Sequence, residues 1–282
     1  MTSVAVIGAG DVGAAVAQAL ATRDKVSRVL LVDDAATVAA GKALDIQQSG
    51  AVTGFHVRLE GTSDLTRVMG AAVCVIADRY GNPPAEWAGD DGLSLLRRLL
   101  PNTGDAPLVF AGPSQASLMR TASREHHVPR LRLLGTSPEA FASAIRSMIA
   151  LEAGCSPSEV VLAVLGVPPK GFVVPWSEAA IGGFALERVL TPVQLTRLES
   201  RVGRLWPPGP YALGQAAAMA AEAVMTASRR TLSLLTVLDG EFGVRDRVAA
   251  LPALLDAGGI AHVHAPVLTT RERVQLETAL AT

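Results

Sequence analysis

The stretch Val4-Ala-Val-Ile-Gly-Ala-Gly-Asp-Val-Gly13 decides the fold of this chain. Its apolar start is typical of a buried strand, and the residues that follow place apolar side chains on one face of a helix. Between the two, the glycines are spaced as Gly-x-Gly-x-x-Gly. Gly8 permits a tight turn, Gly10 leaves room for a diphosphate, and Gly13 lets the helix pack closely on the strand. Because the amides at a helix start favour anions, the stretch predicts a phosphate-binding turn.

A second signal is the acid that ends the next apolar run, Asp33, about 20 residues beyond Gly13. An acid at this distance typically hydrogen-bonds the ribose diol of a dinucleotide. Asp33 and Asp34 together would repel a 2′-phosphate, and no arginine stands beside them in the sequence, so we predict NAD rather than NADP. A glycine-rich turn without a ligand is the alternative. The predicted cofactor-contacting residues are Gly8, Gly10, Asp11, Val12, Gly13, Asp33, Ala77 and Gly112.

The first half of the chain alternates short apolar runs with helix-like segments, which is typical of a doubly wound parallel sheet of the Rossmann type. The runs predicted as buried strands are residues 4–7, 29–32, 73–77, 108–111 and 131–134. The second half has an α+β pattern. It is predicted to contain a helix opening at Thr191 and Pro192, an Ala-rich buried helix over residues 211–233, hairpins at Asp239-Gly240 and near Gly258-Gly259, and a last helix with Thr269 and Glu272 in capping-box spacing. We therefore predict an NAD-binding Rossmann domain over residues 1–136 and a second domain over residues 137–282.

Composition restricts the class of protein. Of the 282 residues, 49% are hydrophobic and 18% are charged, which is typical of a globular chain. The net charge is -1, so no overall field attracts nucleic acid or an anionic membrane. No apolar run is long enough to span a membrane and no basic leader precedes the first strand, so we expect a cytoplasmic protein. The two cysteines and five histidines show no metal-ligand spacing, and we predict no metal site.

From end to end the sequence resembles the lactate/malate dehydrogenase family, with a lean towards the malate branch. The likeness is carried by residues 41–46 (GKALDI), by residues 166–183 with their Val-Pro-Trp-Ser run, by residues 238–244 (LDGEFGV) and by residues 266–269 (PVLT). It implies a Rossmann domain followed by the family's α+β C-terminal domain, NAD(H) as the bound nucleotide, and a homodimer packed through the Ala-rich helix or the helix after Gly41. It also implies hydride transfer between nicotinamide and a 2-hydroxy acid. That reaction needs a His to accept the hydroxyl proton, an Asp to orient it, and two Arg for the substrate carboxylate and the reacting oxygen.

The residues that the family uses for this chemistry are missing from the matching positions. The histidine position in the run Gly166-Val-Pro-Pro169 is Pro168, and proline cannot move a proton. The acid and the arginine of the family's Leu-Asp-x-x-Arg segment fall on Phe141 and Ala144. The positions of two loop arginines and of an Asn-Pro turn are held by Gly81, Trp87 and Gly112-Pro113. We therefore predict that the usual catalytic set is absent and leave the catalytic residues unknown.

Three cations lie near these positions in the sequence, Arg79, Arg146 and Lys170. They are candidates for a relocated anion clamp, with solvated surface side chains as the alternative. We favour a nucleotide-binding relative without dehydrogenase chemistry, a pseudoenzyme working as a sensor, scaffold or partner subunit. The second hypothesis is an NAD-dependent oxidoreductase for another, unknown substrate with a rebuilt proton donor, and the third is a structural protein that binds no nucleotide. An open pocket above the nicotinamide lined by Tyr80, Lys170 or Arg146 would favour the enzyme, whereas Trp87 or Phe172 filling it would count against it.

Overall fold

A central mixed sheet runs through the whole molecule. The computed structural model describes residues 2–83 and 85–281, and within them the main sheet has 11 strands in the order β11-β10-β15-β14-β8-β7-β4-β1-β2-β3, with β16 added beside β15. Neighbours from β3 to β8 pair in parallel, which confirms the predicted doubly wound arrangement. These parallel strands are β1 (Ser3–Ile7), β2 (Arg28–Val32), β3 (Arg58–Thr62), β4 (Val73–Ile76), β7 (Leu108–Phe110) and β8 (Leu133–Gly135).

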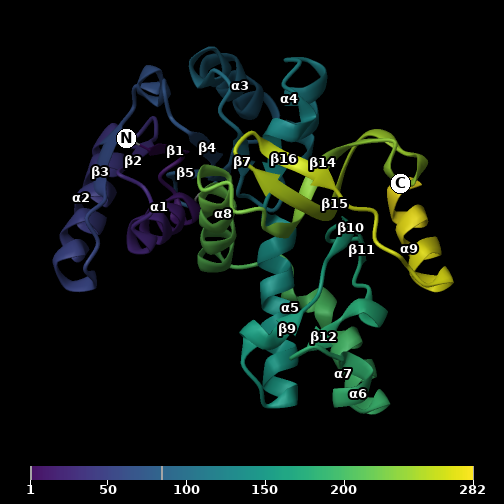
Figure 1. Ribbon diagram of the computed structural model, residues 1–282. Helices are drawn as coiled ribbons and strands as arrows, with labels where there is room; N and C mark the ends of the chain where they lie inside the picture. The colour runs from purple at the N-terminus through teal and green to yellow at the C-terminus, as the bar shows by residue number, and fades with distance from the viewer. Residues whose placement is uncertain (1, 84, 282) are drawn as a thin grey trace.

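Helices cover both faces of the parallel strands (Figure 1). Apolar side chains of α1 (Asp11–Arg23), α2 (Ala36–Thr53) and α8 (Pro210–Met225) join one buried cluster with β1 and β2. Those of α3 (Gly89–Thr103) and α4 (Ala116–Arg124) form a second cluster on the opposite face. The helix face predicted for α1 is confirmed, because its apolar side chains are all buried: Val12, Val16, Ala19 and Leu20.

The antiparallel part of the sheet comes from the second half of the chain. Leu235 of β14 pairs with Gly135 of β8, so strands from both sides of the predicted domain boundary at residue 136 belong to one sheet. Both predicted hairpins are present, at the β14–β15 and β15–β16 connections. The strands are β10 (Leu165–Val167), β11 (Gly171–Val173), β14 (Thr231–Asp239), β15 (Arg245–Asp256) and β16 (Gly259–Val263).

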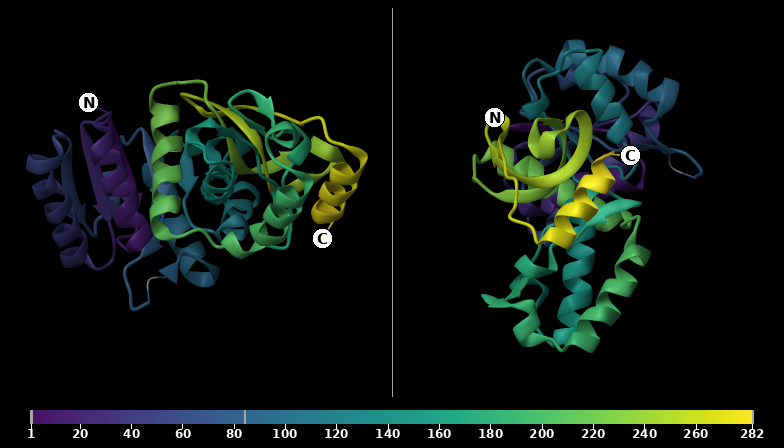
Figure 2. Two further views of the ribbon diagram at one scale, coloured as in Figure 1. Left: turned by 90° about the horizontal axis from the view of Figure 1, so that it is seen from below. Right: turned by 90° about the vertical axis from the view of Figure 1, so that its right-hand side faces the viewer.

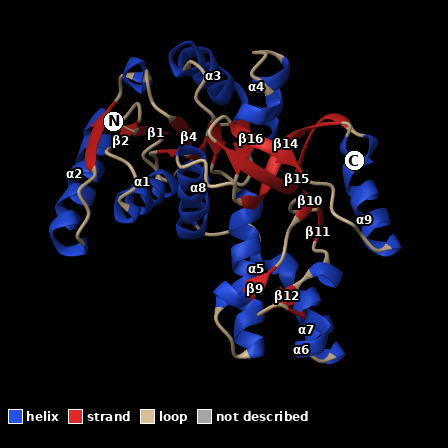
Figure 3. Cartoon of the chain, viewed as in Figure 1, coloured by secondary structure: helices blue, strands red, loops and turns tan. Residues whose placement is uncertain are grey.

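A smaller lobe lies below the sheet, and α5 (Ser137–Ala153) runs from the sheet into it (Figure 2, right). A third buried apolar cluster holds this lobe together. Its other elements are β9 (Val160–Val161), β12 (Ala180–Ile181), β13 (Phe184–Ala185), α6 (Leu186–Val189) and α7 (Pro192–Val202). The C-terminal helix α9 (Thr270–Ala281) lies beside β10 and β11, at the edge of the sheet (Figure 3). Short 3-10 helices complete the chain at Leu65–Val68, Arg130–Arg132, Pro157–Glu159, Trp176–Glu178, Gly203–Leu205 and Glu241–Gly243.

Two of the predicted helix starts are confirmed in detail. Thr191 and Gln194 form a reciprocal capping box at the start of α7, with Pro192 as its first residue. Thr269 donates its amide and hydroxyl to Glu272, and the Glu272 amide donates to the Thr269 hydroxyl at the start of α9. Each box satisfies backbone amides that a helix start leaves without partners.

The prediction of one helix over residues 211–233 is wrong in its last part. Helix α8 ends at Met225, and β14 begins at Thr231. Continuous burial explains the error, since an apolar run without polar alternation does not distinguish a buried helix from a buried strand. The predicted strand at residues 131–134 also starts late, because residues 130–132 form a 3-10 turn. In the described residues, no helix is both long enough and apolar enough to cross a membrane.

Candidate functional site

The glycine-rich turn lies between β1 and α1, as the sequence predicts. Gly8 has a φ of 111°, which favours glycine, and a Cβ built there would lie 2.3 Å from the carbonyl oxygen of Asp78. A Cβ on Gly13 would lie 1.9 Å from the carbonyl oxygen of Gly8. A Cβ on Gly10 would lie 2.3 Å from the carboxyl carbon of Asp78. The turn therefore requires glycine at all three positions, and two of them face Asp78.

Asp78 places its carboxylate at the start of α1. Its Oδ2 accepts the amide of Asp11 at 2.9 Å, and its Oδ1 accepts the amide of Gly13 at 2.9 Å. The backbone closes the same contact, because the Gly10 amide donates to the Asp78 carbonyl oxygen at 2.9 Å. The residue is 6% exposed. The first-turn amides and the helix dipole are thus neutralised by an anion that belongs to the chain itself.

The sheet order explains how Asp78 reaches this place. Strand β1 lies between β2 and β4, and all three run parallel. Parallel strands end at the same edge of a sheet, so the residues after β2 and β4 flank the turn that follows β1. Asp33 follows β2 and Asp78 follows β4. The sequence pattern predicts Asp33 and Ala77 as site residues but not Asp78, although an acid directly after the apolar run of residues 73–77 is a signal for it.

The carboxylate of Asp33 is turned into the protein. Its Oδ2 accepts the amides of Ala9 at 2.7 Å and Tyr80 at 2.8 Å, and its Oδ1 accepts the amide of Ala35 at 2.9 Å. The residue is 4% exposed. Three amide hydrogen bonds hold the side chain in one orientation, in which it joins the turn after β1 to the loop after β4.

Two cations lie near Asp33, Asp34 and Asp78, the acids that follow β2 and β4. Lys42, on α2, donates to the Gly10 carbonyl oxygen at 3.1 Å, and its Nζ lies 5.9 Å from the centre of the Tyr80 ring. Arg98, on α3, lies 3.2 Å from Asp34 Oδ1. No arginine stands beside Asp33 and Asp34 along the sequence, but one lies beside Asp34 in the folded protein. An arginine 64 residues away reaches Asp34, and a local window of sequence does not reveal it.

A third carboxylate comes from the short hairpin of β5 (Asp78–Arg79) and β6 (Ala85–Glu86), in which Asp78 pairs with Glu86. Glu86 accepts the amide of Ser114 at 3.0 Å. Burial raises the pKa of Glu86 above its ordinary value of 4.5, the Ser114 hydrogen bonds oppose this shift, and the negative charge of Asp78 adds to it. A Cβ on Gly112 would lie 2.2 Å from Glu86 Oε2.

Of the remaining predicted cofactor residues, Val12, Ala77 and Gly112 are buried, whereas the side chain of Asp11 is exposed. The amide of Gly112 donates to Gln115 Oε1 at 2.9 Å, and Gln115 Nε2 donates to the Ala77 carbonyl oxygen at 3.2 Å. Val12 is buried in the cluster formed by α1, α2 and α8. The structure therefore brings the predicted set together around the ends of β1, β2, β4 and β7, with internal partners for the polar groups described.

Aromatic side chains occupy the junction between the sheet and the lower lobe. The Phe141 ring packs edge-on against Phe172, with 5.0 Å between ring centres, and edge-on against Trp206, with 5.4 Å. Phe141 has no exposed surface. Such edge-to-face pairs are favourable contacts of apolar rings, so this junction is packed rather than open.

The three candidate cations have separate surroundings. Arg79 forms an ion pair with Asp91 at 2.6 Å and lies over the buried Trp87 ring, 5.7 Å from its centre. Arg146 forms an ion pair with Glu139. Lys170 is exposed and lines a cavity of about 1350 Å³ that α4, β11 and α9 border.

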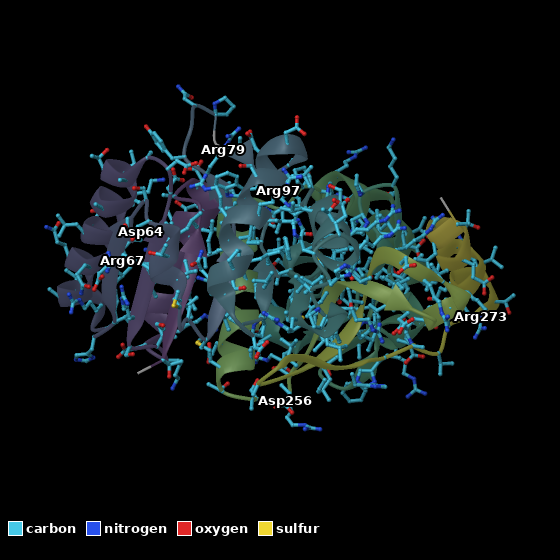
Figure 4. The ribbon with its side chains drawn as sticks, turned by 90° about the horizontal axis from the view of Figure 1, so that it is seen from above. Asp64, Arg67, Arg79, Arg97, Asp256 and Arg273 are labelled. Carbon is cyan, nitrogen blue, oxygen red and sulfur yellow. The ribbon has the colours of Figure 1, made fainter. Side chains whose placement is uncertain are left out.

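Figure 4 shows Arg79 far from Arg273, which lies on α9. Neither Arg79 nor Arg146 is among the residues that line the cavity beside α9. The structure thus assigns the three cations to different places and does not bring them together as an anion clamp. Within the described residues, no group of three or more His, Cys, Asp or Glu is placed to hold a metal ion.

Malate dehydrogenases are similar to this chain over its whole length. The malate dehydrogenase of Thioalkalivibrio sulfidiphilus is 30% identical, over 100% of this chain and 97% of the relative. The malate dehydrogenase structure from Salinibacter ruber matches with a TM-score of 0.89 at 26% identity, over 99% of this chain and 94% of that one. This chain belongs to the malate/lactate dehydrogenase family. A minor L-lactate dehydrogenase structure from Enterococcus mundtii, with a TM-score of 0.89 at 20% identity, covers 99% of this chain and 95% of that one and shows the shared fold. Models of known protein families give no match.

Membership of the malate/lactate dehydrogenase family supports the prediction of an NAD-type cofactor, and the turn and Asp33 have the expected positions. The residues as arranged here nevertheless do not fit a bound diphosphate. Phosphates in such folds bind the free amides at the helix start, and in this family member the amides of Asp11 and Gly13 already donate to Asp78. Asp33, at the position of the ribose-binding acid, likewise accepts the amides of Ala9, Ala35 and Tyr80 and is 4% exposed.

Proposed function

We propose that this protein is a member of the malate/lactate dehydrogenase family that has lost 2-hydroxy acid dehydrogenase chemistry and acts by binding a dinucleotide reversibly. It is a pseudoenzyme, working as a sensor, scaffold or partner subunit. The proposal combines a retained family fold with a site whose proton-transferring groups are replaced by groups that transfer none.

The observation that carries the proposal is the aromatic junction. The family resemblance puts the acid that orients the catalytic histidine at Phe141, whose ring is fully buried against Phe172 and Trp206. Pro168 holds the histidine position itself, on the connection between β10 and β11. Phe141 and Pro168 have no titratable group, so they cannot provide a proton relay. Phe172 packs on Phe141 and also lines the cavity of about 1350 Å³, so its ring does not fill that cavity.

The loop that would supply an arginine is also closed. Trp87, at one of the family's arginine positions, is 4% exposed and packs in the cluster on the α3 and α4 face. Arg79 covers its ring and pairs with Asp91 on α3. A guanidinium paired in this way faces the protein's own carboxylate, and we infer that it does not stabilise charge on a substrate oxygen.

The competing proposal is an NAD-dependent oxidoreductase with a rebuilt proton donor, and one observation favours it. Lys170 lines the cavity of about 1350 Å³ and makes no hydrogen bond or ion pair with another described residue. A lysine amine is one of the groups that enzymes use as a general acid or base. This lysine is exposed, which argues for the first proposal.

The deciding experiment follows NADH absorbance with oxaloacetate, pyruvate, aldehydes and ketones, and measures NADH binding on the same preparation. We expect binding without oxidation in every case. Turnover that is abolished by Lys170→Ala but retained in Lys25→Ala, a matched change of an exposed lysine, would refute the proposal and establish the oxidoreductase. Oxidation of oxaloacetate or pyruvate by the wild type would refute it as well.

We also propose that the protein is a homodimer through α2 or α8. Both helices present apolar side chains to solvent in the single chain, with exposed fractions of 57% for Leu44, 90% for Val52 and 77% for Tyr211. Contiguous exposed apolar surface marks contact surfaces in soluble proteins, and we propose that these side chains contribute to one. Light scattering during gel filtration should give twice the chain mass of 29.2 kDa, and Val52→Lys or Tyr211→Lys should convert the protein into a monomer if its helix carries the contact.

A further inference from the structure

We propose that Asp78 is a built-in occupant of the diphosphate position, so that a dinucleotide binds this protein only in competition with its own carboxylate. The inference rests on the proposed function, because it concerns the regulation of that same site. In this proposal the hairpin of β5 and β6 carries an internal anion, the Asp78 carboxylate, which occupies the amides of the turn after β1.

The hydrogen bonds of Asp78 imitate those of a bound phosphate. Two carboxylate oxygens accept two amides of the first helical turn, those of Asp11 and Gly13, each at 2.9 Å. Charge-assisted bonds from amides at a helix start are the interactions that hold phosphates in dinucleotide folds. One anion at a time can accept them, so the carboxylate and a diphosphate exclude each other.

The glycines of the turn fit this internal strand closely. Cβ atoms on Gly8 and Gly10 would collide with the backbone and the carboxyl group of Asp78, both at 2.3 Å. The space that glycine leaves for a dinucleotide is therefore occupied by the protein's own Asp78. The Gly-x-Gly-x-x-Gly spacing alone does not distinguish these two occupants.

The charges around the turn also oppose the binding of a diphosphate. Asp33, Asp78 and Glu86 place three carboxylates around the ends of β1, β2 and β4. Lys42 is the cation that reaches the turn, where it donates to the Gly10 carbonyl oxygen. A diphosphate entering beside Asp78 would add negative charge to an edge that already carries it, and it gains the helix amides only if Asp78 leaves.

The hairpin that carries Asp78 is short, and its release would break the amide hydrogen bonds of Gly10, Asp11 and Gly13 with Asp78 and that of Tyr80 with Asp33. Two residue pairs join its strands, Asp78 with Glu86 and Arg79 with Ala85. Its ties to the domain include the Arg79–Asp91 ion pair and the Ser114 amide on Glu86. Trp87, the residue after the hairpin, is buried.

The test compares the affinities of the full-length wild type, Asp78→Asn and Asp78→Ala for NADH, ADP and adenosine by titration calorimetry. Both variants should bind NADH and ADP at least about tenfold more tightly, since one competing set of charge-assisted hydrogen bonds is removed. Adenosine, which has no phosphate, should bind all three proteins alike. Asp105→Asn removes the same charge from an exposed loop and should change each affinity by less than about twofold.

A second readout needs no ligand. Hydrogen exchange of the Asp11 and Gly13 amides should be slow in the wild type and faster in Asp78→Ala, because their acceptor is gone. Asp78→Asn keeps the side-chain shape and is the variant more certain to fold. The unfolding temperature of each variant, compared with that of the wild type, shows whether it has folded.

The outcomes separate this inference from the proposed function. Tight NADH binding by the wild type, unchanged in the Asp78 variants, would overturn the internal occupant and leave the nucleotide-binding function standing. Failure of every folded variant to bind NADH would overturn both. Equal gains for adenosine and ADP would also overturn the inference, since the effect would then lie away from the phosphates.

Discussion

Replacing Phe141 by alanine tests whether the junction between the sheet and the lower lobe is a packed core. The ring has no exposed surface and touches Phe172 and Trp206 edge-on. Removing it leaves a space between α5, β11 and the end of the segment that follows α7. Because these elements are fixed by the sheet and by the lobe's own apolar cluster, they cannot collapse to fill that space completely.

The magnitude follows from burial and from the two ring contacts. A fully buried Phe→Ala change costs about 3–5 kcal/mol of unfolding free energy, and the cost is larger where the cavity stays open. Edge-to-face pairs are worth about 0.5–1.5 kcal/mol each beyond their burial, and Phe141 makes two. We therefore expect a loss of about 4 kcal/mol for Phe141→Ala. Phe141→Leu keeps most of the apolar volume and should lose about 1–1.5 kcal/mol.

Urea unfolding followed by circular dichroism measures these losses as shifts of the midpoint at constant slope. Phe184→Ala is the matched control, because the same atoms are removed from a ring that is 63% exposed, and it should cost less than about 0.5 kcal/mol. A loss below about 1 kcal/mol for Phe141→Ala, or an equal loss for Phe184→Ala, would refute the packed junction. It would also remove the main support for the proposed loss of dehydrogenase chemistry.

Three further predictions concern ionisable groups that are buried or partly buried. Glu139→Ala should destabilise by about 3 kcal/mol in urea unfolding, and Glu139→Gln by less, because alanine leaves Arg146 without its carboxylate and the Ser233 amide without an acceptor. The raised pKa of Glu86 means that the folded protein holds this proton more tightly than the unfolded chain, so its contribution to stability falls as pH rises from 4.5 through the folded pKa. Glu86→Gln should therefore stabilise the protein at pH 8 and leave it nearly unchanged below pH 4.5, as thermal melts across this range would show. Burial raises the pKa of Cys74 to about 12, so a thiol reagent at pH 8 should modify only the less buried Cys155 in the folded protein, and mass spectrometry showing two labels would contradict this.

The sequence was a good guide where structure depends on neighbours along the chain. Apolar runs and glycine spacing predicted β1, β2, β4, β7 and α1, and the capping boxes of α7 and α9 follow from residues three apart. Strand β3 was missed, because its sequence RLEGT has little apolar alternation and its pairing with β2 defines it. The end of α8 was misplaced for the opposite reason, since burial continues from helix to strand.

The candidate site shows where local reasoning ends. Gly8, Gly10, Gly13 and Asp33 could be identified from spacing, because the residues of a strand–turn–helix unit meet wherever that unit forms. Whether those residues can bind a dinucleotide depends on which parts of the chain contact them in the folded protein. Asp78 is 65 residues from Gly13, and only the sheet order that places β1 between β2 and β4 brings the two together.

By itself, then, the sequence determined the strand–turn–helix unit, the family resemblance and the non-titratable residues at the catalytic positions. These are properties of covalent order and of side-chain chemistry, and folding does not alter them. The tertiary structure alone decided that Asp78 accepts the amides of the turn, that Arg98 reaches Asp34, and that Phe141 packs against Phe172 and Trp206. Each of these contacts joins segments far apart in the chain, and the free energy that fixes them comes from packing the whole sheet and its helices.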